Sequence, residues 1–168
     1  MKKRVTVIPI PDGNAMKYSS YREAWGRIRR AQGHGFYLEA VTLEESIIAD
    51  RLISFLVCVG AVQPDARLER QSFGQLVQQW IALVPEPIKT KHFSDLRTAV
   101  DEWRKRRNKV VHGMVKSVPG TDHDDVLNFL EEAKLVALEG DALAQALSDW
   151  GKKVKPQLNK SKAKEVGV

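Results

Sequence analysis

The chain has 168 residues, of which 43% are apolar and 29% are charged. This composition is typical of a globular protein rather than a disordered one. The single cysteine, Cys58, excludes an intramolecular disulfide framework and a cysteine-based zinc site. No apolar run reaches about 18 residues, so the sequence predicts no membrane-spanning helix. The apolar run after Lys2, Lys3 and Arg4 is too short for a signal-peptide core, and we therefore expect a cytoplasmic protein.

The formal net charge of +6 is unevenly distributed along the chain. Residues 152–168 contain six lysines and one glutamate, for a net charge of +5, and few large apolar side chains. This composition predicts a flexible basic tail. A second basic cluster lies within residues 104–116, whereas residues 121–149 are acidic. Basic segments attract phosphate backbones, so both nucleic-acid contact and a purely solubilising role remain open for them.

The apolar spacing predicts helices along most of the chain. Pro9, Pro11 and Gly13 first break the N-terminal segment, which predicts an extended arm over residues 1–14. Apolar residues at helical spacing and terminal capping residues then predict five helices. They span about 19–31, 36–59, 73–83 after a Ser72 cap, 94–114 with Ser94 as the cap, and 121–150.

These elements define the predicted fold class. Only residues 5–10 show a period of two, so the sequence predicts an all-α bundle of four to five helices over residues 15–151. The bundle is followed by the basic tail over residues 152–168. The four tryptophans are spread over separate helices, and we assign them to the core: Trp25, Trp80, Trp103 and Trp150.

Two charged residues fall inside the apolar stripes of the predicted helices. Arg107 lies about 20° from the centre of the apolar stripe on the fourth helix. Glu45 lies inside the corresponding stripe on the second helix. Because each charge would otherwise be buried without a partner of opposite charge, we predict that Glu45 and Arg107 form an ion pair. Such a pair either belongs to a functional site or only fixes the register of the two helices.

Further polar residues accompany Arg107 on the same helix. Asn108 and His112 are four residues apart and share a face, and Arg104 lies one turn before Asn108. Arginine binds phosphate through two parallel hydrogen bonds, and histidine transfers protons near neutral pH. These groups match the needs of phosphodiester cleavage by a neighbouring 2′-hydroxyl, which requires a proton shuttle and compensation of negative charge. The set requires no metal and no cofactor.

The segment from Arg107 to His112 reads RNKVVH and resembles the motif of the HEPN family of α-helical domains. That motif is an arginine, often followed directly by asparagine, then a histidine after four to six intervening residues. The resemblance extends more weakly over residues 15–150. It includes a long second helix with an internal acid, the sequence FGQL at the start of a short third helix, and then the motif helix.

The resemblance implies an activity and a set of site residues. Active members are metal-independent endoribonucleases, and many are toxins of toxin–antitoxin systems or phage-defence factors, so an antitoxin or immunity protein is an implied partner. Arg107 and His112 would be catalytic, and Asn108 would position them. We add three supporting residues from their neighbourhood: Arg104, Glu45 and Lys109. One toxin branch carries a modified tyrosine two residues after the histidine, where this chain has Met114.

The geometry of the motif helix also bears on the oligomeric state of the protein. Arg107 and His112 point about 140° apart on an ideal helix, so one copy is poorly placed to surround a phosphate. Members of the family commonly form dimers whose motifs face each other. We therefore expect RNA as the substrate and a symmetric homodimer with a composite site. The alternative is a non-catalytic HEPN-like helical module that binds protein or nucleic acid.

Overall fold

The computed structural model describes the backbone of residues 13–63, 71–113 and 123–165, and side chains within 16–63, 71–113 and 126–157. These residues form five α-helices and no strand, which confirms the predicted all-α fold. The helices are α1 (Gly13–Gly33), α2 (Tyr37–Val59), α3 (Phe73–Leu83), α4 (Leu96–Gly113) and α5 (His123–Glu165).

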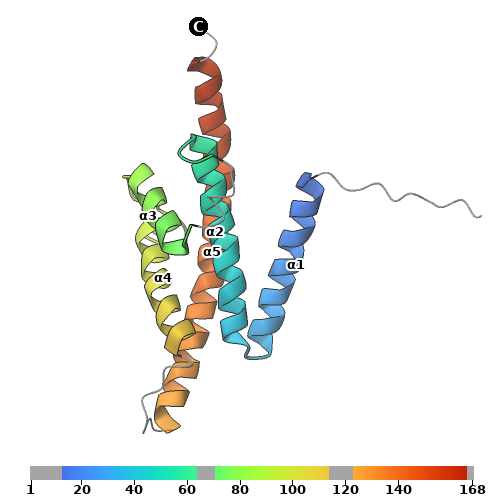
Figure 1. Cartoon of the computed structure of the whole chain (residues 1–168), viewed down its shortest axis with the longest axis vertical. Coiled ribbons are helices and arrows are strands. Elements are labelled where there is room, and N and C mark those ends of the chain that lie inside the picture. Colours follow the sequence, from blue (N-terminus) through green and yellow to red (C-terminus); the bar gives the residue numbers. More distant parts are fainter. Residues whose placement is uncertain (1–12, 64–70, 114–122, 166–168) are drawn as a thin grey trace, which may run out of the picture.

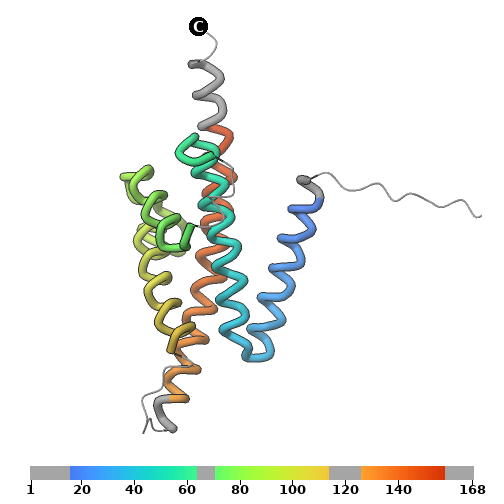
Figure 2. The backbone as a smooth tube through the Cα atoms, in the orientation of Figure 1, coloured from blue at the N-terminus to red at the C-terminus, as the bar shows by residue number. Residues whose placement is uncertain are grey.

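Helices α2 and α5 lie side by side in the middle of the bundle (Figure 1). Helix α1 flanks this pair on one side, and α3 and α4 flank it on the other (Figure 2). Helices α1 and α2 meet at the short turn between them and diverge away from it (Figure 1). The core is built mainly from α2, α4 and α5, and its largest fully buried apolar side chains are Trp80, Trp103, Ile28, Ile48, Leu52, Leu56, Leu96, Leu143 and Leu147.

Capping residues explain where the predicted helices begin and end. Ser72 caps α3: its Oγ accepts from the backbone N–H of Gln75 at 3.3 Å, and the Gln75 side chain accepts from the Ser72 N–H at 2.8 Å. This reciprocal capping box fixes the helix start that the sequence predicts. Helix α2 ends at Gly60, whose φ of +79° favours glycine.

The predicted cap of α4 was wrong by one residue. Asp95, not Ser94, precedes the first helical residue, and its carboxylate accepts from the backbone N–H of Arg97 at 3.1 Å. The same carboxylate also binds the Arg97 guanidinium, with Nη2 at 2.9 Å. An ionised side chain that satisfies both the helix end and an arginine is a stronger cap than a hydroxyl. These hydrogen bonds hold the pKa of Asp95 well below its usual range, led by that from the Arg97 side chain.

The predicted boundaries at the two ends of the chain also need correction. Helix α1 begins at Gly13 rather than near residue 19, so residues 13 and 14 of the predicted arm are helical. The segment after Gly13 contains good helix formers, including Ala15 and Met16, which extend the helix. Residues 1–12 of the arm, Met114 at the predicted end of the motif helix, and Thr121 at the predicted start of the fifth helix lie outside the described residues.

The basic tail predicted over residues 152–168 is helical as far as Glu165, because α5 continues through it without a break. Two contacts hold the first residues of this segment against the bundle. Val154 packs against the core cluster, and the Lys155 ammonium donates to the Ser54 hydroxyl of α2. Burial lowers the pKa of Lys155. Sequence composition alone does not predict these contacts, because they depend on the packing of α5 against α2.

Two absences hold for the described residues. None of the helices within the described ranges is long and apolar enough to cross a membrane. In the same part of the chain, no group of three or more histidine, cysteine, aspartate or glutamate side chains is arranged to hold a metal ion.

Candidate functional site

The predicted ion pair between Glu45 and Arg107 is confirmed. Arg107 projects from α4 towards α2, and its Nη2 donates to Oε2 of Glu45. Its Nη1 donates to Oδ1 of Asn108 at 2.8 Å. The side chains of Arg107 and Glu45 are only 19% and 17% exposed, so water screens their attraction weakly. Burial lowers the pKa of Arg107, yet a guanidinium in a protein stays charged.

These contacts fix the orientation of the guanidinium. Glu45 and Asn108 each engage a different nitrogen of the planar group, so rotation about its terminal bonds would break one of the two hydrogen bonds. The remaining nitrogen, Nε of Arg107, is buried and has no hydrogen-bond partner. A guanidinium carries five N–H donors, so donors remain for a ligand after both contacts are made. Glu45 and Asn108 are therefore suited to position Arg107.

His112 lies in the last turn of α4 and is exposed. It makes no hydrogen bond or ion pair within the described part of the chain, in contrast to Arg107 one and a half turns earlier. The adjacent Gly113 faces Phe129 of α5, whose ring would lie 3.8 Å from a Cβ at that glycine. The imidazole therefore stands at the edge of the α4–α5 contact, where a substrate can reach it.

The other two predicted members of the site do not join this cluster. Arg104 turns to Asp101, with its Nε at 2.9 Å and its Nη2 at 2.8 Å from Oδ1, and lies against Gly74 of α3. Lys109 is exposed, and no hydrogen bond or ion pair links it to Glu45 or Asn108 within the described residues. The structure thus brings together Glu45, Arg107 and Asn108, but not the continuous polar strip that the helical spacing predicts.

Sequence reasoning missed the glutamate next to Glu45. Glu44 is fully buried between α2 and α5, and its Oε1 accepts from Gln32 Nε2 at 3.0 Å. The other carboxyl oxygen, Oε2, has no partner. Burial, with a smaller contribution from the charge of Asp141, raises the pKa of Glu44 to about 9. Glu44 is therefore a neutral acid at pH 7, directly beside the charged Glu45.

A glycine makes room for this buried acid. A Cβ at Gly140 of α5 would clash with the Glu44 carboxyl and lie 2.8 Å from Cζ2 of Trp103. Trp103 is itself fully buried and donates to the backbone carbonyl of Val136 at 2.8 Å. The three helices α2, α4 and α5 thus pack at close range directly behind the Glu45–Arg107 pair.

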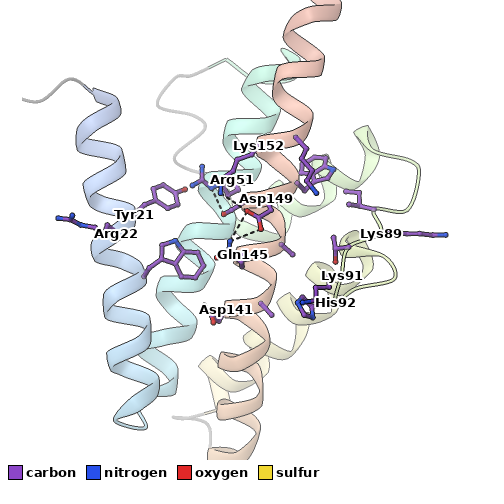
Figure 3. A pocket seen from close by; sticks show the side chains of 18 of the residues that line it. Tyr21, Arg22, Arg51, Lys89, Lys91, His92, Asp141, Gln145, Asp149 and Lys152 are labelled. Carbon is purple, nitrogen blue, oxygen red and sulfur yellow. Dashed lines mark hydrogen bonds and ion pairs between the residues drawn. The ribbon is translucent and has the colours of Figure 1, made fainter.

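The structure also contains a groove that the sequence did not predict. It has a volume of about 960 Å³ and lies between α1, the α3–α4 loop and the outer face of α5 (Figure 3). Trp25 and Trp150 line this groove and are half-buried, whereas Trp80 and Trp103 lie fully in the core as predicted. The exposed basic and aromatic residues of α1 and α5 were the available signal, but their pairing requires the tertiary fold.

No model of a known protein family matches the chain, and comparisons with curated proteins and with solved structures found no match either. The resemblance to the HEPN family therefore depends on the RNKVVH segment and on its place in an all-α domain.

Proposed function

We propose that this chain is a metal-independent endoribonuclease of HEPN type, with Arg107 and His112 as its catalytic residues. The observation that carries the proposal is the geometry of α4: Arg107 is held by Glu45 and Asn108, and the exposed His112 follows on the same helix. A pre-positioned guanidinium stabilises developing negative charge without reorganising during the reaction. An exposed imidazole can exchange a proton with a substrate hydroxyl.

The proposed reaction is an internal transesterification of RNA. The 2′-oxygen attacks the adjacent phosphorus and loses its proton to an imidazole, while the bond from phosphorus to the 5′-oxygen breaks. The leaving oxygen takes up a proton, so the products are a 2′,3′-cyclic phosphate and a 5′-hydroxyl. Arg107 compensates the charge on the non-bridging oxygens. One imidazole performs one of these transfers at a time, and a second copy of His112 would supply the other.

An exposed apolar face next to the motif supports the homodimer that such a site needs. Five side chains of α5, each 49–55% exposed, lie on the segment whose Phe129 faces Gly113 at the end of α4: Val126, Leu127, Leu130, Leu135 and Leu138. Exposed apolar patches of this kind mark protein interfaces. A symmetric partner seated on this face would bring two motif helices together.

The dimer has a direct test. Leu127 and Leu138 lie within about 20° of one another on the helix, so the double substitution Leu127→Glu/Leu138→Glu places two charges on the same face. We expect this variant to sediment as a monomer and to lose RNA cleavage. The matched control is Leu83→Glu, on an exposed leucine of α3, which should remain dimeric. A wild-type chain that is a fully active monomer at micromolar concentration would contradict the composite site.

The activity itself is tested by incubating RNA with the protein in the presence of a chelator. We expect wild-type protein to produce cyclic-phosphate ends, and His112→Ala and Arg107→Ala each to lose about 100-fold or more of the rate. Lys105→Ala, which removes an exposed cation from the same helix, should retain activity. Absence of cleavage by wild-type protein in pools of tRNA, rRNA and mRNA would overturn the proposal.

A second candidate function is a non-catalytic helical module that binds protein or nucleic acid. The observation that favours it is that Arg107 is already bonded to Glu45, since this ion pair serves equally well to join α2 and α4. Under this alternative, His112→Ala folds, dimerises and binds its partner like wild type. Under the enzyme proposal, the biological setting implied by the resemblance is a toxin–antitoxin or phage-defence system, with an antitoxin or immunity protein as a further partner.

A further inference from the structure

We propose that the groove between α1 and α5 binds single-stranded polynucleotide, at a place distinct from the Arg107–His112 motif. None of the residues that line the groove belongs to the motif or to its supporting residues. The groove would hold the RNA that the proposed ribonuclease cleaves. That the polynucleotide is RNA rests on this proposed function. The evidence for the groove is independent of the motif.

The charge of the groove is the first observation. Seven lysine and arginine side chains line it against two aspartates. Arg51 lies between α1 and α5, and the other six are carried by α1, the α3–α4 loop and α5: Arg22, Arg29, Lys89, Lys91, Lys152 and Lys153. Cations on several sides of one trough create a positive potential along it, which attracts a phosphate backbone.

The cations outnumber the acids that could neutralise them. Lys91 and Lys153 are exposed and form no hydrogen bond or ion pair within the described part of the chain. Asp149 is 3.1 Å from the ammonium of Lys152 and also attracts Lys153, and Asp141 attracts Arg29. These are the two acids among the lining residues, against seven lysines and arginines. The groove therefore keeps a surplus of unpaired positive charge.

The groove is built on fixed elements. The loop that carries Lys91 and His92 is closed by a tight turn, in which the Thr90 N–H donates to the Phe93 carbonyl at 2.9 Å. Arg97 ties the start of this loop to α4 by donating to the Val84 carbonyl at 2.7 Å. The backbone of this wall is thus held in place before any ligand arrives, which lowers the entropic cost of binding.

The wall formed by α1 is also tied to the bundle. The Tyr21 hydroxyl donates to Asp50 of α2, and the same carboxylate is 2.9 Å from the ammonium of Lys17. The guanidinium of Arg51 lies over the Tyr21 ring, 4.0 Å from its centroid (Figure 3). These contacts fix α1 against α2 beside the groove.

The aromatic lining of the groove favours a polynucleotide over other polyanions, such as an acidic peptide. Tyr18 lines the groove with 70% of its surface exposed. Trp25 and Trp150 also line it, but both are half-buried and pack against the core, Trp150 against Phe55 and Trp80. Exposed rings between basic side chains are the pattern that binds single strands, because unpaired bases stack on the rings while phosphates contact the cations. The volume of about 960 Å³ exceeds what a lone phosphate needs. An acidic peptide would use the cations but not the rings.

The experiment measures binding of a fluorescein-labelled oligouridine of about 12 nucleotides by anisotropy, a length within known single-strand site sizes. All proteins carry His112→Ala, so that no RNA is cut. Lys91→Glu/Lys153→Glu should weaken binding at least about tenfold, and the loss should shrink as salt rises. The matched control, Arg27→Glu/Arg30→Glu, changes the charge equally on exposed residues of α1 outside the groove and should bind like its parent.

A second pair of variants tests the stacking. Tyr18→Ala should weaken binding about tenfold, and Tyr18→Phe, which keeps the ring, should not. Equal losses in the groove variant and the control, or competition by polyglutamate as strong as by unlabelled oligouridine, would overturn the inference in favour of general charge or an acidic protein partner. Absence of binding would overturn it as well. If the wild-type chain cleaves RNA but the groove variant binds oligouridine normally, the groove inference is wrong and the ribonuclease proposal stands. If the groove variant loses binding but the wild-type chain does not cleave RNA, the ribonuclease proposal is wrong and the groove inference stands.

Discussion

Two basic regions of this molecule differ in how their charges are used. On α4, three arginines are each engaged by an acid: Arg104 by Asp101, Arg106 by Glu139, and Arg107 by Glu45. In the groove between α1 and α5, Lys91 and Lys153 have no ion-pair partner among the described residues. Basic side chains therefore hold the motif in position on α4, whereas in the groove they remain available to a ligand.

The difference teaches that net charge along the sequence is a poor guide to binding surfaces. The densest run of basic residues, 104–109, is largely neutralised by acids from its own helix and from α2 and α5. The groove gathers scattered lysines and arginines from segments far apart in sequence, and few acids accompany them. Packing, rather than local composition, determines which cations a polyanion can reach.

The largest expected effect concerns Glu44, which is fully buried. Its pKa of about 9, against an ordinary 4.5, means that the folded protein holds this proton more tightly than the unfolded chain. Stability is therefore full below about pH 4.5 and falls as the pH rises towards 9, by about 4 kcal/mol between pH 5 and pH 8. Glu44→Gln does not titrate and should lose much less over this range. Urea denaturation at several pH values measures the difference.

The control for Glu44 is an exposed carboxyl on the same helix. Glu39→Gln should follow the pH dependence of the wild-type chain, because the Glu39 side chain is exposed in the folded protein. Parallel stability curves for wild type and Glu44→Gln between pH 5 and pH 9 would contradict a neutral, buried Glu44.

The second prediction compares an ion pair from each region. A double-mutant cycle on Glu45→Ala and Arg107→Ala should give a coupling energy of about 1–3 kcal/mol, because truncating either partner strands a largely buried charge. The same cycle on Asp149→Ala and Lys152→Ala, whose side chains are 50% and 71% exposed, should give less than about 0.5 kcal/mol. Equal coupling in the two cycles would mean that both regions use their charges alike.

The smallest effect is expected from the groove cations. Lys91→Gln/Lys153→Gln removes two of the seven lysines and arginines that line the groove against two acids, so mutual repulsion among the cations is relieved. Stability should stay unchanged or rise by at most about 0.5 kcal/mol at low salt, and the gain should vanish at high salt. Thermal denaturation at two salt concentrations measures this. A loss of more than about 1 kcal/mol would show that these lysines stabilise the fold.

The sequence predicted those features that depend on one helix or on a clear apolar stripe. Helix α3 has its predicted bounds because Ser72 provides a capping box at one end and Pro85 follows the other. The Glu45–Arg107 pair followed from helical spacing alone. Ser94 and Asp95 are adjacent cap formers, and only the bond network with Arg97 distinguishes them.

The remaining features depend on how helices pack. Helix α2 lies in the middle of the bundle and is buried on more than one face, so Glu44 is buried although it lies outside the single stripe used to predict Glu45. The start of the predicted tail is held by contacts such as Lys155 with Ser54, about a hundred residues away in the chain. The groove requires α1, the α3–α4 loop and α5 to meet, which no local pattern encodes.

We assign RNA cleavage to the motif on α4 and RNA binding to the groove. This assignment is tested most directly by single-turnover RNA cleavage measured against protein concentration. We predict that Lys91→Glu/Lys153→Glu raises the protein concentration needed for half-maximal rate at least about tenfold while leaving the maximal rate unchanged. His112→Ala should abolish the maximal rate. A groove variant that lowers the maximal rate without changing the half-maximal concentration, or that cleaves like wild type throughout, would contradict the account.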